Sequence, residues 1–301
     1  MRNIFISIFI LLLPLNASAC DVCGCGNGSS FFGILPQSQF KFGGLRYQTK
    51  TFDSHFTSNL LRTEENFQSI EPWLRLYPIK KTQLILMGSV QSNTQTIMAS
   101  GERKTLSGIG DVSALAHYNV VNTFFDSTAH TLDHIWLLGG GIKLPTGKYD
   151  YAMTENEVAN PNFQLGTGSV DYLVNSIYTV RKNNIGLNVD LSYKINGTNK
   201  NHYKFANKSR TIVNGFAQIS LGDFMFLPNI GVLGEYAKND KQNGIDNRFS
   251  GGYMTTAMLG SEIYYKKITA GFLVQKPLVQ NLSGSELKLR NSFMCHLTLL
   301  F

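Results

Sequence analysis

The stretch at residues 287–301, LKLRNSFMCHLTLLF, constrains the fold of this chain more than any other feature of the sequence. From Phe293 onward every second residue is apolar, and the residues between them are more polar, with Leu300 as the exception. Because side chains alternate between the two faces of a strand, this period of two predicts a β-strand with one apolar face. Such a strand, ending on the aromatic Phe301, is typical of the closing strand of a transmembrane β-barrel. An edge strand of a soluble sandwich is the alternative.

Strand and turn signals recur along the rest of the chain and favour the barrel. In residues 185–196 apolar and polar side chains alternate without a break, and the polar set includes both Asp190 and Lys194, which suits a wet lumen. We predict an all-β fold, a transmembrane antiparallel β-barrel of about twelve strands. The expected strands are residues 37–50, 66–77, 83–93, 110–121, 134–144, 169–181, 185–196, 210–221, 224–236, 252–265, 269–280 and 287–301.

A targeting segment is expected at residues 1–19. Arg2 precedes an apolar run at residues 4–15, and Ala17-Ser18-Ala19 supplies the small residues that signal peptidases need. The run is too short to span a bilayer as a helix, which needs roughly 20 apolar residues. Residues 20–36 are expected to be a mobile, Cys-rich N-terminal segment, because small polar residues bury too little surface to fold. The barrel is expected at residues 37–301.

The expected connections alternate in length. Four of them are short, at residues 78–81, 182–184, 222–223 and 266–267. Most of the others are longer, such as the polar loop expected at residues 94–107, and the connection at 122–133 is long where a short turn is due. Short periplasmic turns and longer outer loops are the usual asymmetry of bacterial outer-membrane barrels. We therefore expect the outer membrane of a Gram-negative bacterium as the location, with both termini in the periplasm.

The charge pattern argues against nucleic acid as a partner. The formal net charge is +7 at pH 7, but the basic residues are scattered, and the pairs Lys80-Lys81, Arg181-Lys182 and Lys266-Lys267 fall at expected turns. A nucleic-acid footprint needs basic residues clustered on one face. An enzyme is not expected either, because none of the six His residues stands in a recognisable Ser/His/Asn arrangement.

Strand parity predicts which charged side chains face the lumen. The expected lumen set is Asp111, His117, Lys143, Asp171, Asp190, Lys194, Glu235 and Glu262. Their mixed signs fit a selective, partly filled pore, and equally a narrow, salt-bridged interior without an open channel. Phe216, Met254 and Met258 are expected to face inward as well, which suits small hydrophobic cargo.

Cys20, Cys23 and Cys25 place three thiols within six residues, close enough to bind one soft ion such as copper(I) or zinc. A disulfide between two of them is an alternative, because the periplasm is oxidising. A third interpretation is lipidation of Cys20, since the sequence Ala17-Ser18-Ala19-Cys20 matches a loose lipobox. Lipidation would leave only Cys23 and Cys25 as metal ligands. Cys295, on the expected outer face of the last strand, is interpreted as a small apolar residue.

Three glycine-rich motifs occur in order: GIGD at residues 108–111, KLPTG at 143–147 and GTGSVD at 166–171. In this order and spacing they resemble the phenol meta-degradation outer-membrane family, whose members are described as transporters. The resemblance covers roughly residues 108–193 and implies an exported barrel, surrounded by outer-membrane lipid, that passes small and often hydrophobic compounds. Resemblance to outer-membrane barrels also implies that the barrel-assembly machinery recognises the last strand, which ends at Phe301. The CxxCxC segment is not part of the family pattern.

The motifs have an architectural interpretation too. Gly139-Gly140-Gly141 allows a strand to bend or a lumen side chain to approach its backbone, and Pro145-Thr146-Gly147 ends that strand. The function expected from the sequence is a channel or transporter for small solutes, including hydrophobic or aromatic ones. The alternative is a protein that handles copper or zinc and whose barrel mainly anchors the cysteine segment.

Overall fold

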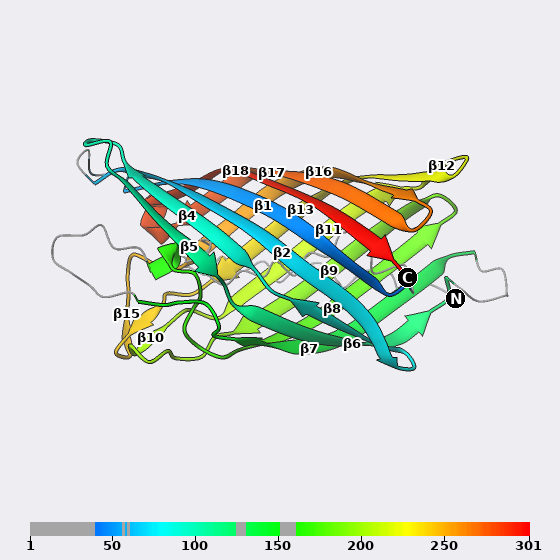
Figure 1. The fold of residues 1–301 in the computed structure, drawn as a ribbon, viewed down its shortest axis with the longest axis horizontal. Coiled ribbons are helices and arrows are strands. Elements are labelled where there is room, and N and C mark those ends of the chain that lie inside the picture. Colours follow the sequence, from blue (N-terminus) through cyan, green and yellow to red (C-terminus); the bar gives the residue numbers. More distant parts are fainter. Residues whose placement is uncertain (1–39, 56–57, 59–60, 125–130, 151–160) are drawn as a thin grey trace, which may run out of the picture.

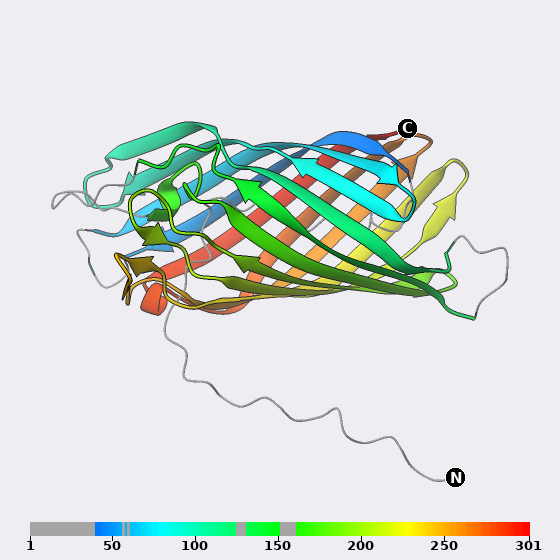
Figure 2. The same ribbon diagram turned by 90° about the horizontal axis from the view of Figure 1, so that it is seen from below.

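The computed structural model describes residues 40–55, 58, 61–124, 131–150 and 161–301 (Figure 1). These residues form a closed antiparallel β-barrel of twelve strands inclined to its long axis, which confirms the predicted fold class (Figure 2). The predicted signal peptide and cysteine segment lie outside the described residues. Within the part of the chain that is described, no helix is long and apolar enough to cross a membrane.

The strands follow one another around the barrel as a series of hairpins. In chain order the elements are β1 (Phe42–Ser54), β2 (Thr63–Ile79), β3 (Thr82–Met87), β4 (Val90–Ile97), β5 (Arg103–Ile109), β6 (Val112–Asn122), β7 (Asp133–Leu144), η2 (Pro161–Phe163), β8 (Asp171–Lys182), β9 (Ile185–Ile195), β10 (Tyr203–Lys204), β11 (Lys208–Ala217), β12 (Ile219–Leu221), β13 (Phe224–Ala237), β14 (Lys241–Gln242), β15 (Ile245–Asp246), β16 (Gly252–Tyr265), β17 (Ile268–Leu282), η3 (Ser283–Ser285) and β18 (Leu287–Leu300). β1 pairs with β2 on one side and with β18 on the other, so the first and last strands close the barrel.

Three of the twelve strands are each divided in two by a short break. Gly88 and Ser89 separate β3 from β4, Gly110 and Asp111 separate β5 from β6, and Gln218 separates β11 from β12. β2 continues across the first break, because it pairs with both β3 and β4. β3 pairs onward with β6, and β4 pairs onward with β5. Within the described residues β5 has β4 as its one partner, so its second edge is not part of a ladder.

One expected connection is wrong. Residues 94–107 do not form a polar loop; they make up most of a hairpin in which β4 pairs with β5. Thr94 and Thr105 lie opposite each other, and their hydroxyls are 3.4 Å apart. Threonine is β-branched and favours strands, but the exposed side chains of this hairpin are largely polar, so the apolar period-two signal is missing.

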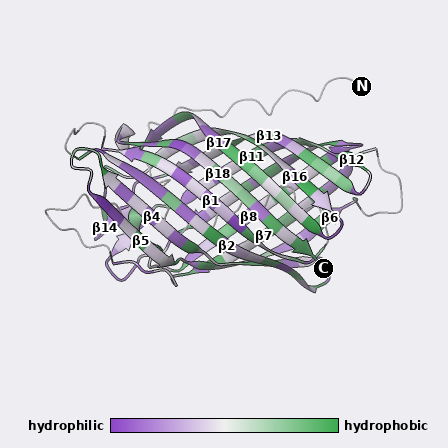
Figure 3. Cartoon of the chain, turned by 45° about the horizontal axis from the view of Figure 1, so that its top comes forward, coloured by the Kyte–Doolittle hydropathy of each residue, from purple (hydrophilic) through white to green (hydrophobic). Residues whose placement is uncertain are grey.

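The outer face of the barrel is apolar and its inner face is mixed. On β9 the side chains of Ile185, Leu187 and Leu191 point outward and are 70%, 42% and 48% exposed, whereas Asn188 and Asp190 are buried on the inner side. Hydrophobic and hydrophilic residues alternate along the other strands as well (Figure 3). Many aliphatic and aromatic side chains of these strands are exposed on the wall. A contiguous apolar surface of this extent is the property of a barrel that spans a membrane.

The two ends of the barrel differ. β1 begins and β18 ends at the same end, which we call the short-turn end (Figure 1). This end carries tight turns at residues 80–81, 183–184, 222–223 and 266–267, each with one residue at positive φ, as tight hairpins require. The connection from β6 to β7 also lies here and is longer, without changing the strand count. The opposite, long-loop end carries the β4–β5 hairpin, η2, η3 and a small sheet of β10, β14 and β15.

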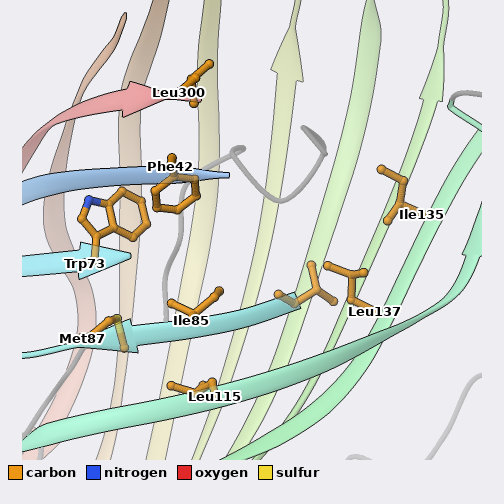
Figure 4. Packing of buried hydrophobic residues seen from close by; sticks show 9 residues of the cluster. Phe42, Trp73, Ile85, Met87, Leu115, Ile135, Leu137 and Leu300 are labelled. Atoms are coloured by element: carbon orange, nitrogen blue, oxygen red, sulfur yellow. The ribbon is translucent and has the colours of Figure 1, made fainter. Parts of the chain in front are cut away.

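Inside the barrel, apolar side chains gather toward both ends. Toward the short-turn end a buried cluster contains Phe42, Trp73, Ile85, Met87, Leu115, Ile135, Leu137, Ile177 and Leu300 (Figure 4). Toward the long-loop end a second cluster contains Phe52, Phe67, Phe163, Ala237, Met254, Leu282, Leu287 and Leu289. On β1 the polar side chains of Arg46, Gln48 and Lys50 lie between Phe42 and Phe52. Along β1 the lumen is therefore apolar near its ends and polar between them. On the strands β11, β13, β16, β17 and β18 a third buried apolar cluster lies between the ends; it contains Ile212, Leu233, Met258, Leu273 and Met294.

Candidate functional site: the lumen

The three glycine-rich motifs meet at one place on the inner wall. Lys143, near the end of β7, is at the centre: its Nζ lies 2.5 Å from Asp111 Oδ2 and 2.8 Å from Asp171 Oδ2. The same ammonium group contacts the hydroxyl of Thr167. All of these side chains are buried. We call Asp111, Lys143, Thr167, Ser169 and Asp171 the motif cluster.

Asp111 binds two backbone segments as well as the lysine. The backbone N–H groups of Gly147 and Thr167 donate to its carboxylate, both at 3.0 Å. A Cβ at Gly166 would lie 2.3 Å from Asp111 Oδ1, so only glycine allows this close approach. The GIGD, KLPTG and GTGSVD motifs are therefore parts of one hydrogen-bonded structure.

Asp171 connects the motif cluster to the next strand. It accepts hydrogen bonds from the hydroxyl of Ser169 at 2.7 Å and from the backbone N–H of Gly197 at 3.1 Å. Lys194, from β9, lies 3.1 Å from Asp171 Oδ2. Two cations and two carboxylates thus form a neutral group in which the charges compensate one another.

Residues 161–170, which we call the inward segment, fold into the long-loop end of the barrel. Phe163 and Leu165 are buried there. Gln91 and Asn93, on the inner face of β4, donate hydrogen bonds to backbone carbonyls of this segment at 3.1 and 3.2 Å. The motif cluster holds the other end of the segment. The segment is therefore attached to the wall on both sides.

Two further predicted lumen residues, His117 and Asp190, belong to a row of hydrogen bonds that lies closer to the short-turn end than the motif cluster does. His117 Nε2 is 2.7 Å from Asn175 Oδ1, and the amide of Asn175 donates to Asp190 at 2.6 Å. Glu262, on β16, accepts a hydrogen bond from the Tyr264 hydroxyl at 2.9 Å. His117 is packed over Gly139, where a Cβ would meet the imidazole and the backbone, so the glycines of β7 admit a lumen side chain.

Glu235, the last of the predicted set, lies in a basic part of the lumen. Its carboxylate is 3.1 Å from Lys208 Nζ and 3.8 Å from Arg210 Nε. The eight predicted lumen residues thus all lie on the inner face, buried or partly buried. The structure brings four of them together, namely Asp111, Lys143, Asp171 and Lys194. The other four lie in separate clusters. Phe216, Met254 and Met258 are buried on the inner face too.

The sequence reasoning missed several charged residues on β1 and β2. Arg46 and Arg75 are each 1% exposed, and Arg46 forms an ion pair with Glu71. The guanidinium of Arg46 lies 5.6 Å from the ring centroid of Trp73, and that of Arg75 lies 4.5 Å from that of Phe42, as in cation–π contacts. The alternation of side chains along β1 and β2 also places Arg46 and Arg75 on the inner face. The same period of two could therefore have identified them from the sequence.

A cavity of about 30 Å³ lies in the lumen against β1, β2 and β4. Its walls include the polar side chains of Gln48, Lys50, Ser69, Gln91 and Asn93. A volume of this size is enough for about one water molecule. Its lining suits a polar guest.

The predicted metal site cannot be placed on this structure, because Cys20, Cys23 and Cys25 lie outside the described residues. Metal binding, a disulfide and lipidation of Cys20 stay predictions. Among the residues that are described, no group of three or more His, Cys, Asp or Glu is arranged to hold a metal ion. Cys295 is a free thiol on the outer face of β18.

Twelve antiparallel strands closed into a barrel, apolar outside and polar inside, define the fold class of bacterial outer-membrane β-barrels. The chain is similar in fold to the COG4313 outer membrane channel from Pseudomonas putida F1, with a TM-score of 0.62 and 12% identity over 97% of this chain and 100% of that one. The NanC porin is less similar, with a TM-score of 0.44 and 11% identity over 85% of this chain and 98% of that one. The β domain of the Bordetella autotransporter BrkA gives a TM-score of 0.45 and 11% identity over 87% of this chain and 100% of that one.

No family model matches the sequence, and no curated protein matches it. At 12% identity the likeness to the COG4313 channel shows a shared fold and nothing finer.

Proposed function

We propose that this protein is an outer-membrane channel that passes small solutes, apolar and aromatic ones among them, through the barrel lumen. The observation that carries the proposal is the division between an apolar outer wall and a lumen lined by polar and charged side chains. Such a wall is stable in lipid, and a polar interior provides a route for solutes across it. The proposed location is the outer membrane of a Gram-negative bacterium.

The proposed orientation places the short-turn end in the periplasm and the long-loop end outside, following the usual asymmetry of these barrels. β1 and β18 then begin and end on the periplasmic side. Recognition of β18 and Phe301 by the barrel-assembly machinery is part of the same proposal.

The inward segment supports a small cargo. The rings of Phe163 and Phe67 pack edge to face with centroids 6.3 Å apart, and both join the apolar cluster that includes Phe52 and Met254. Side chains of the inward segment and of the wall therefore meet inside the long-loop end. A solute that passes through this end has to move between these groups, which favours small molecules.

The apolar clusters at the two ends of the lumen support the hydrophobic and aromatic part of the proposal. Phe42 and Trp73 pack with ring centroids 4.6 Å apart near the short-turn end. Phe52 and Phe67 pack with centroids 5.8 Å apart near the long-loop end. Aromatic faces of this kind bind the ring of an aromatic solute through apolar contact and edge-to-face geometry.

Uptake by liposomes tests the proposed function. Liposomes that contain the refolded protein are compared with empty liposomes in glucose, phenyl glucoside, maltose and raffinose, none of which crosses lipid readily. We expect glucose and phenyl glucoside to enter and raffinose to stay outside. Phe163→Ala should raise the rate for maltose, because it removes a ring from the narrow part of the lumen, whereas the outer-wall variant Phe272→Ala should not. Tight liposomes around a correctly folded barrel would contradict the proposal.

A further inference from the structure

Lys50, on the inner face of β1, carries a charge that no described residue neutralises directly. No ion pair or hydrogen bond joins its Nζ to another residue within the described part of the chain. The ammonium group has three N–H donors, and it is costly to bury without an acceptor. Lys50 lines the cavity described above, beside Gln48 and Phe67. An anion in the lumen would complete its coordination.

The neighbouring strands offer more hydrogen-bond donors at the same level. Ser292 of β18 lies directly opposite Lys50, is 2% exposed, and has a hydroxyl without a hydrogen-bond partner among the described residues. Gln275 of β17 lies directly opposite Ser292, and its amide donates to the sulfur of Met258 at 3.7 Å, a weak acceptor. Side chains that are directly opposite have Cβ atoms about 4.5–5.5 Å apart. Three adjacent side chains therefore present donors to one region of the lumen.

The charges around Lys50 favour an anion. Lys208 and Arg210 act on Lys50 electrostatically across the lumen, and Glu235 is the carboxylate that all three share.

Two further carboxylates lie within range, but each has its own partner. Glu71, which acts on Lys50, forms the ion pair with Arg46. Asp190, which acts on Arg210, accepts the hydrogen bond from Asn175. Positive potential therefore remains at Lys50, and the low dielectric constant of the barrel wall and the surrounding lipid strengthens it.

We propose that Lys50, Ser292 and Gln275 form a binding station for the carboxylate of a small organic acid on its way through the lumen. The two oxygens of a carboxylate accept from the ammonium group and from the neighbouring hydroxyl or amide. Phe67, which lies directly opposite Lys50 on β2, provides apolar contact for the body of the acid. This inference rests on the proposed function and names a substrate class for it: acids that combine one carboxylate with an apolar or aromatic body.

Reversal potentials in planar bilayers test the inference with the full-length folded barrel. A gradient of potassium benzoate gives the permeability of benzoate relative to potassium. We expect the wild-type protein to favour benzoate, and Lys50→Gln to lower the ratio about tenfold, the effect of one charged hydrogen bond. Ser292→Ala should lower the ratio by less, and Lys50→Arg should retain the preference. Lys267→Gln, in an exposed turn, removes the same charge outside the lumen and should have no effect.

The outcomes separate the inference from the proposed function. A channel that admits phenyl glucoside but shows no benzoate preference, or whose preference survives Lys50→Gln, overturns the inference and leaves the channel intact. A protein that admits neither phenyl glucoside nor ions overturns the proposed function, and the inference with it. Heat-modified gel mobility of each variant shows that its barrel is folded. If Lys50→Gln does not fold, Ser292→Ala provides the test, because an unchanged benzoate preference in that variant overturns the inference.

Discussion

A single lysine holds together three segments of the chain at the long-loop end. Lys143 binds Asp111 and Asp171, which are both buried and less than 6 Å apart by the sum of their distances to the shared Nζ. Lys194 adds the second cation. In a site of this kind the loss of one partner costs more than the net stabilisation by the pair, because the remaining charges stay buried.

Replacement of this lysine should therefore destabilise the barrel strongly. Lys143→Met keeps most of the side-chain volume but leaves Asp111 without its cation and Asp171 with Lys194 alone. We expect the free energy of unfolding to fall by about 3–5 kcal/mol, measured by urea unfolding in detergent micelles. Lys148→Met is the matched control, since Lys148 is 72% exposed beside Asp150 and contributes little. Equal midpoints for the two variants would contradict this role of Lys143.

At this scale the sequence predicts the face on which a residue lies, but not its neighbours. Parity along each strand is a local property, and it is enough to place Asp111, Lys143 and Asp171 on the inner side. Their meeting depends on the register of β6, β7 and β8 and on the paths of residues 145–150 and 161–170. Neither follows from local pattern, because register is fixed by the pairing of whole strands. The motifs indicate architecture, and the structure adds that they form one cluster.

Among the elements, the inward segment behaves as part of the wall. It has a single turn of 3-10 helix, η2, and its backbone carbonyls are bound by side chains of β4 while its far end is bound by Asp111. Gly166 passes so close to Asp111 and Gly147 that a Cβ would lie 2.3 and 3.0 Å from their atoms. Close packing, more than local helix propensity, determines the position of this segment.

Gly166→Ala should consequently loosen the inward segment. The added methyl group has to push Asp111 or the backbone at Gly147 aside, which costs about 1–3 kcal/mol as overpacking. We expect faster amide hydrogen exchange across residues 161–170. Gly234→Ala is the control, because a Cβ there meets nothing within 4 Å. Unchanged exchange in Gly166→Ala would show that the segment is held by other contacts.

Twelve strands follow from the sequence because each hairpin has at least one apolar face that must contact lipid. The hairpin of β4 and β5 is the exception, since its side chains are largely polar and the apolar period is absent. The inward segment is a second exception, because its buried residues, such as Phe163 and Leu165, stand in a stretch without strand periodicity. Tertiary contacts alone determine where such residues lie.

For the molecule as a whole, the pairing of β1 with β18 determines the architecture. The two strands are antiparallel along almost their entire length, with one irregularity between Thr51 and Phe52. β1 is paired on its other side with β2, and β18 on its other side with β17, so both strands lie inside the sheet. Closure removes the unpaired N–H and C=O groups that lipid cannot satisfy.

A disulfide across this seam tests the closure. Tyr47 lies directly opposite Cys295, so Tyr47→Cys should form a disulfide with it under mild oxidation when Cys20, Cys23 and Cys25 are replaced by serine. The product should migrate faster on a non-reducing gel after denaturation. Leu45→Cys, opposite Leu297 on the same outer face, should not cross-link, because it is offset from Cys295 by two residues. Cross-linking of both variants, or of neither, would contradict the register of the seam.

The same seam has a consequence for how the chain reaches its final state. β1 is among the earliest strands in the chain, whereas its partner β18 is the last strand of the barrel. The hydrogen bonds between β1 and β18 therefore form only after every intervening hairpin is available. Until then an incomplete sheet has two open edges, each a template for another chain. Shortened forms of the protein that lack β18 should therefore accumulate as aggregates instead of as smaller barrels. The full chain has to be protected from aggregation until β1 pairs with β18.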